Sequence, residues 1–260
     1  MSLSLSIVIP VLNEANNIAA CLSALQPLRQ LGAEVIVVDG HSEDNTLALA
    51  ESGADQLITS KQGRARQMNA GAAIARGKWL LFLHADTSLP EKMPDIMMAW
   101  DFSKSSWGFF SVRLDSDRLA FRFIEWFMNR RSYYTGIGTG DQCQFVEREV
   151  FEEIGGFADI PLMEDIELSK RLKRISRPLV VVAKVKTAAR KWQKDGLLRT
   201  ILMMWRIRLA YFFGAAPEQL VEKYYPANSP ANSPANVTLP TQDSSSGSIT
   251  SESQKSADKV

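Results

Sequence analysis

The first ninety residues alternate short, continuous apolar runs with segments whose apolar residues recur at helical spacing. The continuous runs have the length and composition of buried strands, and they cover residues 5–11, 33–39, 54–60 and 78–86. The segments with helical spacing lie between them, at residues 14–28, 43–53 and 64–77. Short buried strands that alternate with helices predict an α/β fold, in which a parallel sheet is covered by helices on both faces.

The pattern after residue 90 is less regular. It predicts further strands at residues 107–115, 141–149 and 179–184. It predicts helices at residues 118–131, 150–157 and 163–176, of which the first carries aromatic residues along one face. We expect this half to extend the sheet in mixed orientation and to form the wall of a substrate site.

A change in composition divides the chain near residue 226. Residues 227–260 are rich in Ser, Pro and Asn, contain the short repeat ANSP, and hold no aromatic residue. Such a segment has little to bury, so we predict a disordered tail. Residues 1–226 are expected to form one domain, whose two halves meet at about residue 90.

Composition narrows the class of protein. The 260 residues are 45% hydrophobic and 23% charged, which is typical of a globular protein. The formal net charge of +1 gives no bulk attraction to nucleic acid, so no nucleic-acid partner is expected. The two cysteines lack metal-binding spacing and no basic leader precedes the first apolar run, so we expect a reducing, cytoplasmic location.

Residues 197–213 form a strongly apolar helical segment that Arg199, Arg206 and Arg208 interrupt. It therefore falls short of the ~20 apolar residues that a membrane-spanning helix needs. One interpretation is a helix that packs in the core or against a second copy of the chain in a homodimer. The other is a helix that lies on an anionic membrane surface as a peripheral contact.

Polar residues follow the first two predicted strands. Pro10 and Glu14 lie at the end of the first strand, and Asp39 ends the second. A carboxylate at the carboxyl end of a strand can accept hydrogen bonds from ribose hydroxyls or from a base N–H. The alternative is that the two acids cap the helices that follow, where Ser42 is also placed to act as a cap.

The third predicted strand is followed by Arg64, Arg66 and Asn69 at the start of a helix. The two arginines suit phosphate oxygens, and the amide suits a sugar or a base. The alternative is a solvated first turn. Because cations oppose the dipole at a helix N-terminus, the pattern favours an anionic ligand.

Two acidic clusters come later in the chain. The fourth predicted strand ends in the sequence HADT, where Asp86 suits a hard divalent cation and strand alternation would put His84 on the same side. A metal site, part of one, and an ordinary turn all stay open there. Glu164 and Asp165 begin a predicted helix, either as acids favoured by the helix dipole or as a general base whose pKa its neighbour raises.

Five segments in this order resemble the family 2 glycosyltransferases with the GT-A fold. They read VIPVLNE, VVDGHSEDNT, GRARQMNAGAAIARGKWLLFLHADT, FVEREVFEEIGGF and MEDIELSKRLK, and the likeness covers residues 5–194. HADT in place of Asp-x-Asp, together with AARKW at residues 188–192, is similar to a small bacterial subgroup of uncharacterised members. The resemblance implies a Rossmann-like, mostly parallel central sheet flanked by helices, with a mixed C-terminal acceptor half.

The resemblance also implies a function. The chain would be a hexosyltransferase that moves a sugar from a nucleoside diphosphate sugar, of the UDP type, to an unknown hydroxyl acceptor that could be lipid-linked. Residues of about 1–90 would bind the donor through Pro10, Glu14, Asp39, Arg64, Arg66, Asn69 and Asp86. Asp86, with His84 as the second candidate ligand, would hold Mg²⁺ or Mn²⁺ on the diphosphate.

In the acceptor half, of about residues 91–226, the resemblance makes Asp165 the base beside Glu164. Further contacts on the acceptor or phosphate side would come from Asp141, Gln142, Arg190 and Trp192. A single displacement would invert the anomeric carbon. The processive signature Gln-x-x-Arg-Trp is only faintly matched at residues 190–192, so a polymer synthase is not expected.

Two departures from the family pattern concern the acids. Gly40 follows Asp39 where many members carry a second acid, and His84 replaces the first acid of the metal motif, which should weaken affinity for a hard cation. A nucleotidyltransferase is one alternative, although PVLNEANN lacks its glycine-rich loop, and GIGTGD at residues 136–141 is interpreted as a flexible substrate loop. A non-catalytic nucleotide-sugar-binding protein is another, and it would not need Asp165.

Overall fold

One mixed sheet organises the chain. The computed structural model describes residues 4–99, 105–188 and 197–224, and within them eight strands run in the order β3-β2-β1-β4-β7-β6-β8-β5. The strands β1 (Leu5–Val11), β2 (Glu34–Asp39), β3 (Gln56–Thr59) and β4 (Trp79–Phe82) are parallel to one another. Their carboxyl ends therefore lie along one edge of the sheet.

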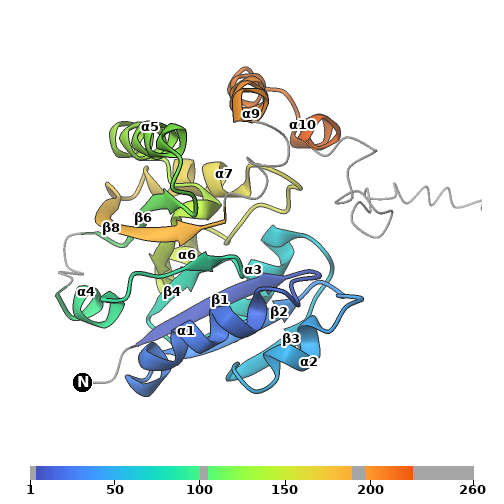
Figure 1. Cartoon of the computed structure of the whole chain (residues 1–260), viewed down its shortest axis with the longest axis vertical. Helices are drawn as coiled ribbons and strands as arrows, with labels where there is room; N and C mark the ends of the chain where they lie inside the picture. The colour runs from blue at the N-terminus through green and yellow to red at the C-terminus, as the bar shows by residue number, and fades with distance from the viewer. Residues whose placement is uncertain (1–3, 100–104, 189–196, 225–260) are drawn as a thin grey trace, which may run out of the picture.

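Helices cover both faces of this parallel part (Figure 1), because its central strands carry buried apolar residues on both faces. Ile7 and Ile9 of β1 pack with α1 (Ile18–Gln30), whereas Val8 packs on the opposite face with α3 (Arg64–Ile74). The helix α3 lies so close that a Cβ on Gly71 would stand 2.5 Å from a Val8 methyl carbon. The predicted sheet with helices on both faces is confirmed. The short α2 (Thr46–Ala50) links β2 to β3.

The second half extends the sheet in mixed orientation, as predicted. The strand β7 (Phe145–Glu147) is antiparallel to β4 and to β6 (Trp107–Leu114), and β8 (Leu179–Thr187) is parallel to β6. The two-residue β5 (Thr87–Ser88) pairs antiparallel with β8. The connecting helices are α4 (Met93–Ala99), α5 (Leu119–Thr135), α6 (Arg148–Glu153) and α7 (Glu164–Leu172), with a 3₁₀ turn η1 (Gly140–Gln142) before β7.

The last described helices form a small apolar cluster of their own. Ile207 of α9 (Leu197–Phe212) and Leu220 of α10 (Pro217–Tyr224) are buried with Leu162 and Met163, which directly precede α7. Figure 1 shows α9 and α10 side by side at the end of the molecule that α5 also occupies. None of the helices in the described ranges is long and apolar enough to cross a membrane.

Several predicted boundaries are wrong. The strand β4 ends at Phe82, and the chain then turns, with the Thr87 N–H donating to the His84 carbonyl at 3.0 Å. His84 and Asp86 therefore lie in a turn and not on a strand, so strand alternation does not place them on the same side. The strand predicted at 141–149 is confined to residues 145–147, because η1 precedes it. The predicted cap Ser42 stands outside α2, which begins at Thr46. The predicted tail lies outside the described residues.

Candidate active site

The carboxyl ends of β1 and β2 are joined by a residue that the sequence analysis missed. The buried Gln67 of α3 donates its amide hydrogens to the carbonyls of Val11 and Val38, at 2.7 and 2.8 Å. A Cβ on Gly40 would stand 3.1 Å from the Gln67 amide atoms. A side chain at position 40 would therefore crowd the Gln67 amide that joins the two strand ends.

The acids of the first two strand ends lie on loops that are bonded to each other. The Asp39 carboxylate is fully buried and accepts from the Ser42 N–H at 2.9 Å and from its hydroxyl at 2.5 Å. The Ser42 hydroxyl oxygen also accepts from the Asn13 N–H at 2.9 Å. Glu14 is half-buried, and its carboxylate accepts from Asn17 at 2.5 Å. Pro10 lies opposite Val38 in the ladder between the two strands.

A second group of acids surrounds His84. A Cβ on Gly140 would stand 2.7 Å from the His84 Cε1 atom, 3.0 Å from Nε2 and 3.9 Å from the Asp165 Oδ2 atom. The histidine ring after β4 and the carboxylate at the start of α7 therefore meet at η1. The Ile166 N–H donates to the Asp165 Oδ1 atom at 2.7 Å, and the Gly140 N–H donates to Oδ2 at 2.8 Å.

The charges of this group act on one another. Burial lowers the pKa of His84 and the Arg64 charge lowers it further, against the opposing effect of Asp141, Asp86 and Asp165. Burial raises the pKa of Asp141, which the His84 charge lowers and the charge of Asp86 raises. Burial also lowers the pKa of Arg131, whose neighbours are Asp165 and Asp141. Arg131 was not among the predicted site residues, because no local pattern distinguishes it on α5.

Glu164, the residue before Asp165, forms an ion pair with Arg64. It is buried at the start of α7, and its carboxylate lies 3.3 Å from the Arg64 Nε atom at the start of α3. Burial raises the pKa of Glu164, the Arg64 charge opposes that shift, and the Asp165 charge adds to it. The ion pair therefore ties the two predicted site helices together next to Asp165.

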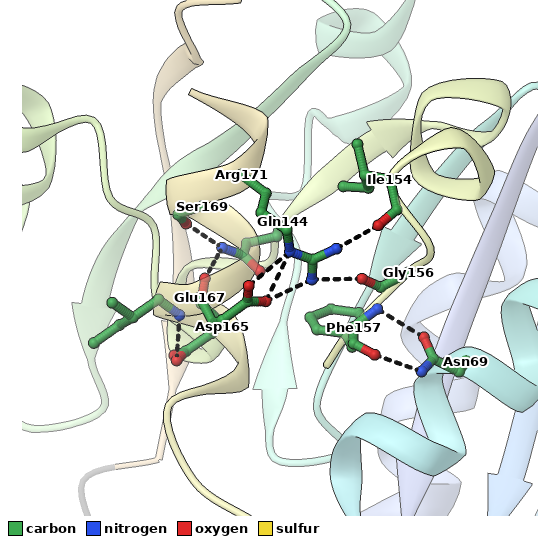
Figure 2. A network of polar contacts seen from close by, with 10 residues as sticks. Asn69, Gln144, Ile154, Gly156, Phe157, Asp165, Glu167, Ser169 and Arg171 are labelled. Atoms are coloured by element: carbon green, nitrogen blue, oxygen red, sulfur yellow. Dashed lines mark hydrogen bonds and ion pairs between the residues drawn. The ribbon is translucent and has the colours of Figure 1, made fainter. Parts of the chain in front are cut away.

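A network of hydrogen bonds connects α7, which carries Asp165, to Gln144 and to residues 154–156 (Figure 2). The Gln144 amide donates to the Asp165 carbonyl at 3.1 Å and to the Ser169 hydroxyl at 2.8 Å. Arg171 donates to the carbonyls of Ile154 and Gly156, both at 2.6 Å. Sequence reasoning missed Gln144 and Arg171, because the partners described above lie far from them in the sequence.

Two residues that were predicted to contact the donor, Asn69 and Arg66, are bonded to residues 157 and 159. The Asn69 amide bonds both backbone groups of Phe157, accepting from its N–H at 2.9 Å and donating to its carbonyl at 2.8 Å (Figure 2). Arg66 pairs with Asp159 at 2.7 Å on the surface. A ligand contact by either side chain would therefore compete with a contact to residues 157–159.

The remaining predicted site residues are Asp86, Gln142, Arg190 and Trp192. Asp86 is exposed, on the turn after β4. Gln142 is buried, and its carbonyl oxygen accepts from the Ser132 hydroxyl at 2.8 Å, while its amide nitrogen has no hydrogen-bond partner among the described residues. Arg190 and Trp192 lie outside the described residues.

The donor set bears on the implied metal. Within the described ranges, no three His, Cys, Asp or Glu side chains form a group that could hold a metal ion. Mg²⁺ is usually bound by one or two carboxylates together with substrate phosphates and waters. An exposed Asp86 carboxylate at the edge of the sheet fits such a site, in which the substrate supplies most of the ligands.

Comparison with known proteins decides the family. A family model described as Glycosyl transferase family 2 matches residues 6–155, which is more than half of the chain. The chain belongs to this family. A PGL/p-HBAD biosynthesis glycosyltransferase of Mycobacterium bovis is 42% identical over 93 residues, which are 33% of this chain and 36% of the relative. The uncharacterized glycosyltransferase YibD of Escherichia coli is 26% identical over 100 residues, or 36% of this chain and 29% of that protein. The chain thus spans about a third of the relatives' length.

Solved structures confirm the GT-A fold. S. aureus TarS 1–349 superposes with a TM-score of 0.59 at 17% identity, over 73% of this chain and 61% of the 1–349 chain. The mannosyltransferase PcManGT from Pyrobaculum calidifontis, in complex with GDP-Man and Mn²⁺, superposes with a TM-score of 0.55 at 18% identity, over 81% of this chain and 61% of that one. At these identities the likeness establishes the architecture alone.

Proposed function

We propose that this family 2 chain transfers a sugar from a nucleoside diphosphate sugar, of the UDP type, to a hydroxyl acceptor, with inversion of the anomeric carbon. The observation that carries the proposal is the meeting of His84, Asp141 and Asp165 around Gly140, beside the carboxyl ends of the parallel strands. Ligands of open α/β sheets bind at that edge. The donor class is supported by TarS 1–349 in complex with UDP-GlcNAc and by PcManGT in complex with GDP-Man.

The donor would lie across the ends of β1 and β2. In this proposal Glu14 contacts the nucleoside, and the buried Asp39 acts by fixing the loop that carries Ser42. Arg64 would face the diphosphate, since it is close enough to His84 and Asp141 for its charge to act on both pKa values. Arg66 and Asn69 would support the site through the 157–159 segment that they bind.

Asp86 would hold Mg²⁺ or Mn²⁺ on the diphosphate. When bound, the metal would neutralise the charge that builds on the departing nucleotide. Burial favours the neutral imidazole of His84 by lowering its pKa, so the ring would bond the donor or orient a water. The Gly140 backbone fixes where that ring can lie.

Asp165 would be the general base. Two backbone N–H groups hold its carboxylate, one on each oxygen, and each oxygen keeps a lone pair for a substrate hydroxyl. The acceptor hydroxyl would give its proton to Asp165 as its oxygen bonds the anomeric carbon. The bond from that carbon to the diphosphate oxygen would break at the opposite side, which inverts the carbon and releases the nucleoside diphosphate.

Replacement of the base tests this assignment. Asp165→Asn keeps the shape of the side chain and should lower transfer about 10²- to 10⁴-fold, while a thermal shift with UDP and Mn²⁺ stays as in the wild type. Asp115→Asn is the matched control, because Asp115 is a surface acid that pairs with Lys186. Full transfer by the Asp165→Asn variant would refute the base. Donor binding without turnover in the wild type would instead indicate a nucleotide-sugar-binding protein.

A further inference from the structure

Two neighbouring helices expose large apolar side chains that a globular surface normally buries. The side chains of Phe123, Trp126 and Phe127 on α5 are 69%, 57% and 38% exposed. Those of Leu202, Trp205 and Phe212 on α9 are 63%, 56% and 75% exposed. The rings of Phe127 and Trp205 stack with their centroids 5.4 Å apart, so the exposed apolar rows of the two helices meet at this pair. The six residues are here called the aromatic face.

The aromatic face is not the ordinary outer side of two amphipathic helices. The helix α5 already buries Phe121, Ile124 and Met128 on its inner side, and α9 buries Ile207. The solvent-facing positions of both helices are apolar as well. They recur at helical spacing, so each helix carries a second apolar stripe on its outer side. A contiguous apolar patch of this kind marks a surface that binds a partner.

The exposed charges of α5 and of the described part of α9 are positive. Arg130 and Arg206 are exposed, one turn from Trp126 and next to Trp205 respectively. No acidic residue occurs between residues 197 and 212. The one acid of α5, Glu125, is 2% exposed and pairs with Arg122 at 3.0 Å. Aromatic and leucine side chains flanked by arginine are typical of helices that lie in the interface of an anionic membrane.

From these observations we propose that the aromatic face binds the surface of an anionic lipid bilayer. A second copy of the chain fits less well, because a two-fold interface would bring the arginines of both copies together. The segment 227–260 fits less well too, since it holds no aromatic residue and only Val237, Leu239, Ile249 and Val260 as large aliphatic residues.

The two helices that carry the aromatic face also come near Asp165. The helix α5 leads into residues 136–140, where the Gly140 N–H holds Asp165. Tyr211 of α9 carries the Lys170 ammonium 4.5 Å above its ring. Burial raises the pKa of its hydroxyl, and the nearby charges of Glu167 and Asp165 raise it further. If the proposed function holds, docking would bring the acceptor side of the site to the lipid surface, where a membrane-borne acceptor would lie.

Vesicle flotation of the full chain tests the proposal. The chain should float with vesicles of phosphatidylcholine and phosphatidylglycerol, bind vesicles of phosphatidylcholine alone less, and detach as salt is raised. Trp126→Ser combined with Trp205→Ser should weaken binding at least about tenfold, because two large apolar side chains leave the interface. Arg130→Gln combined with Arg206→Gln should remove the preference for the anionic vesicles.

The control is Val182→Ser, a change at a side chain that is 82% exposed on β8 and is not part of the aromatic face. It should leave vesicle binding unchanged. Every variant should keep the wild-type unfolding temperature and its thermal shift with UDP and Mn²⁺, so failure of the docking proposal is distinguishable from failure of the donor site. Failure of the wild type to float, or equal flotation of the tryptophan variant, would overturn the proposal. A dimer that the tryptophan changes dissociate, without vesicle binding, would assign the face to a second copy.

Discussion

A single methyl group at Gly140 should disturb the proposed active site without disturbing the fold. The Cβ of Gly140→Ala would stand 2.7 Å from the His84 Cε1 atom, about 0.7 Å closer than the 3.4 Å at which ordinary contact begins. It would also stand 3.9 Å from the Asp165 Oδ2 atom, which is ordinary contact. The backbone of Gly140 does not adopt a positive φ, so alanine adds steric conflict rather than backbone strain.

The methyl group should therefore move the His84 ring by somewhat less than 1 Å, or move η1 away from it and lengthen the Gly140–Asp165 hydrogen bond. Misplacement of reacting groups by about 1 Å can cost about 10²-fold in rate. We expect kcat for metal-dependent donor hydrolysis to fall about 10- to 100-fold, with an unchanged thermal shift on UDP binding.

A double-mutant cycle separates the clash from other effects of alanine. In a His84→Ala background the ring is gone, so Gly140→Ala should cost far less than it does in the wild type. Single-turnover hydrolysis of the nucleotide sugar is the assay for all four proteins. Wild-type activity of the Gly140→Ala variant, or an equal loss in both backgrounds, would refute the reasoning.

Three further variants test separate parts of the account. Asp86→Ala should abolish the extra thermal shift that Mn²⁺ adds to UDP, and an undiminished Mn²⁺ effect would remove Asp86 from the metal site. Gln67→Leu should lower the free energy of unfolding in urea by about 2 kcal/mol, since it deletes two buried hydrogen bonds; an unchanged urea midpoint would contradict this. Because folding raises the pKa of Glu164 above its ordinary value of 4.5, protonated Glu164 stabilises the folded state below pH 4.5. This stabilisation is lost as the pH rises through the folded-state pKa. Glu164→Gln should therefore gain stability relative to the wild type between pH 4.5 and pH 7, and a pH-independent difference would show that Glu164 does not titrate on folding.

The parallel part of the fold could be predicted because its signal is local. The strands β1 and β2 contain the continuous apolar runs 7–11 and 35–38, and burial on both faces of a sheet requires that composition. The end of β4 could not be predicted in the same way. The apolar run continues through Leu83, but the turn at His84 is stabilised by its own backbone bond and by pairing of Thr87 with the distant Thr187.

The partners of the polar side chains were the least predictable feature. Asn69 looks like a ligand contact in the sequence, yet its amide bonds a backbone 88 residues away. Gln67 was passed over two positions earlier on the same helix, although it joins the ends of β1 and β2. Helical periodicity shows which face of α3 meets the sheet, but it does not show which backbone carbonyls lie there as hydrogen-bond acceptors.

Release of nucleoside diphosphate from a panel of nucleotide sugars, with and without Mn²⁺ or Mg²⁺, tests the central claim most directly, because it needs no knowledge of the acceptor. The account predicts that the wild-type chain releases UDP from a UDP-sugar only when the metal is present, and that Asp86→Ala does not. Release from no donor, together with no stabilisation by any nucleoside diphosphate, would contradict it.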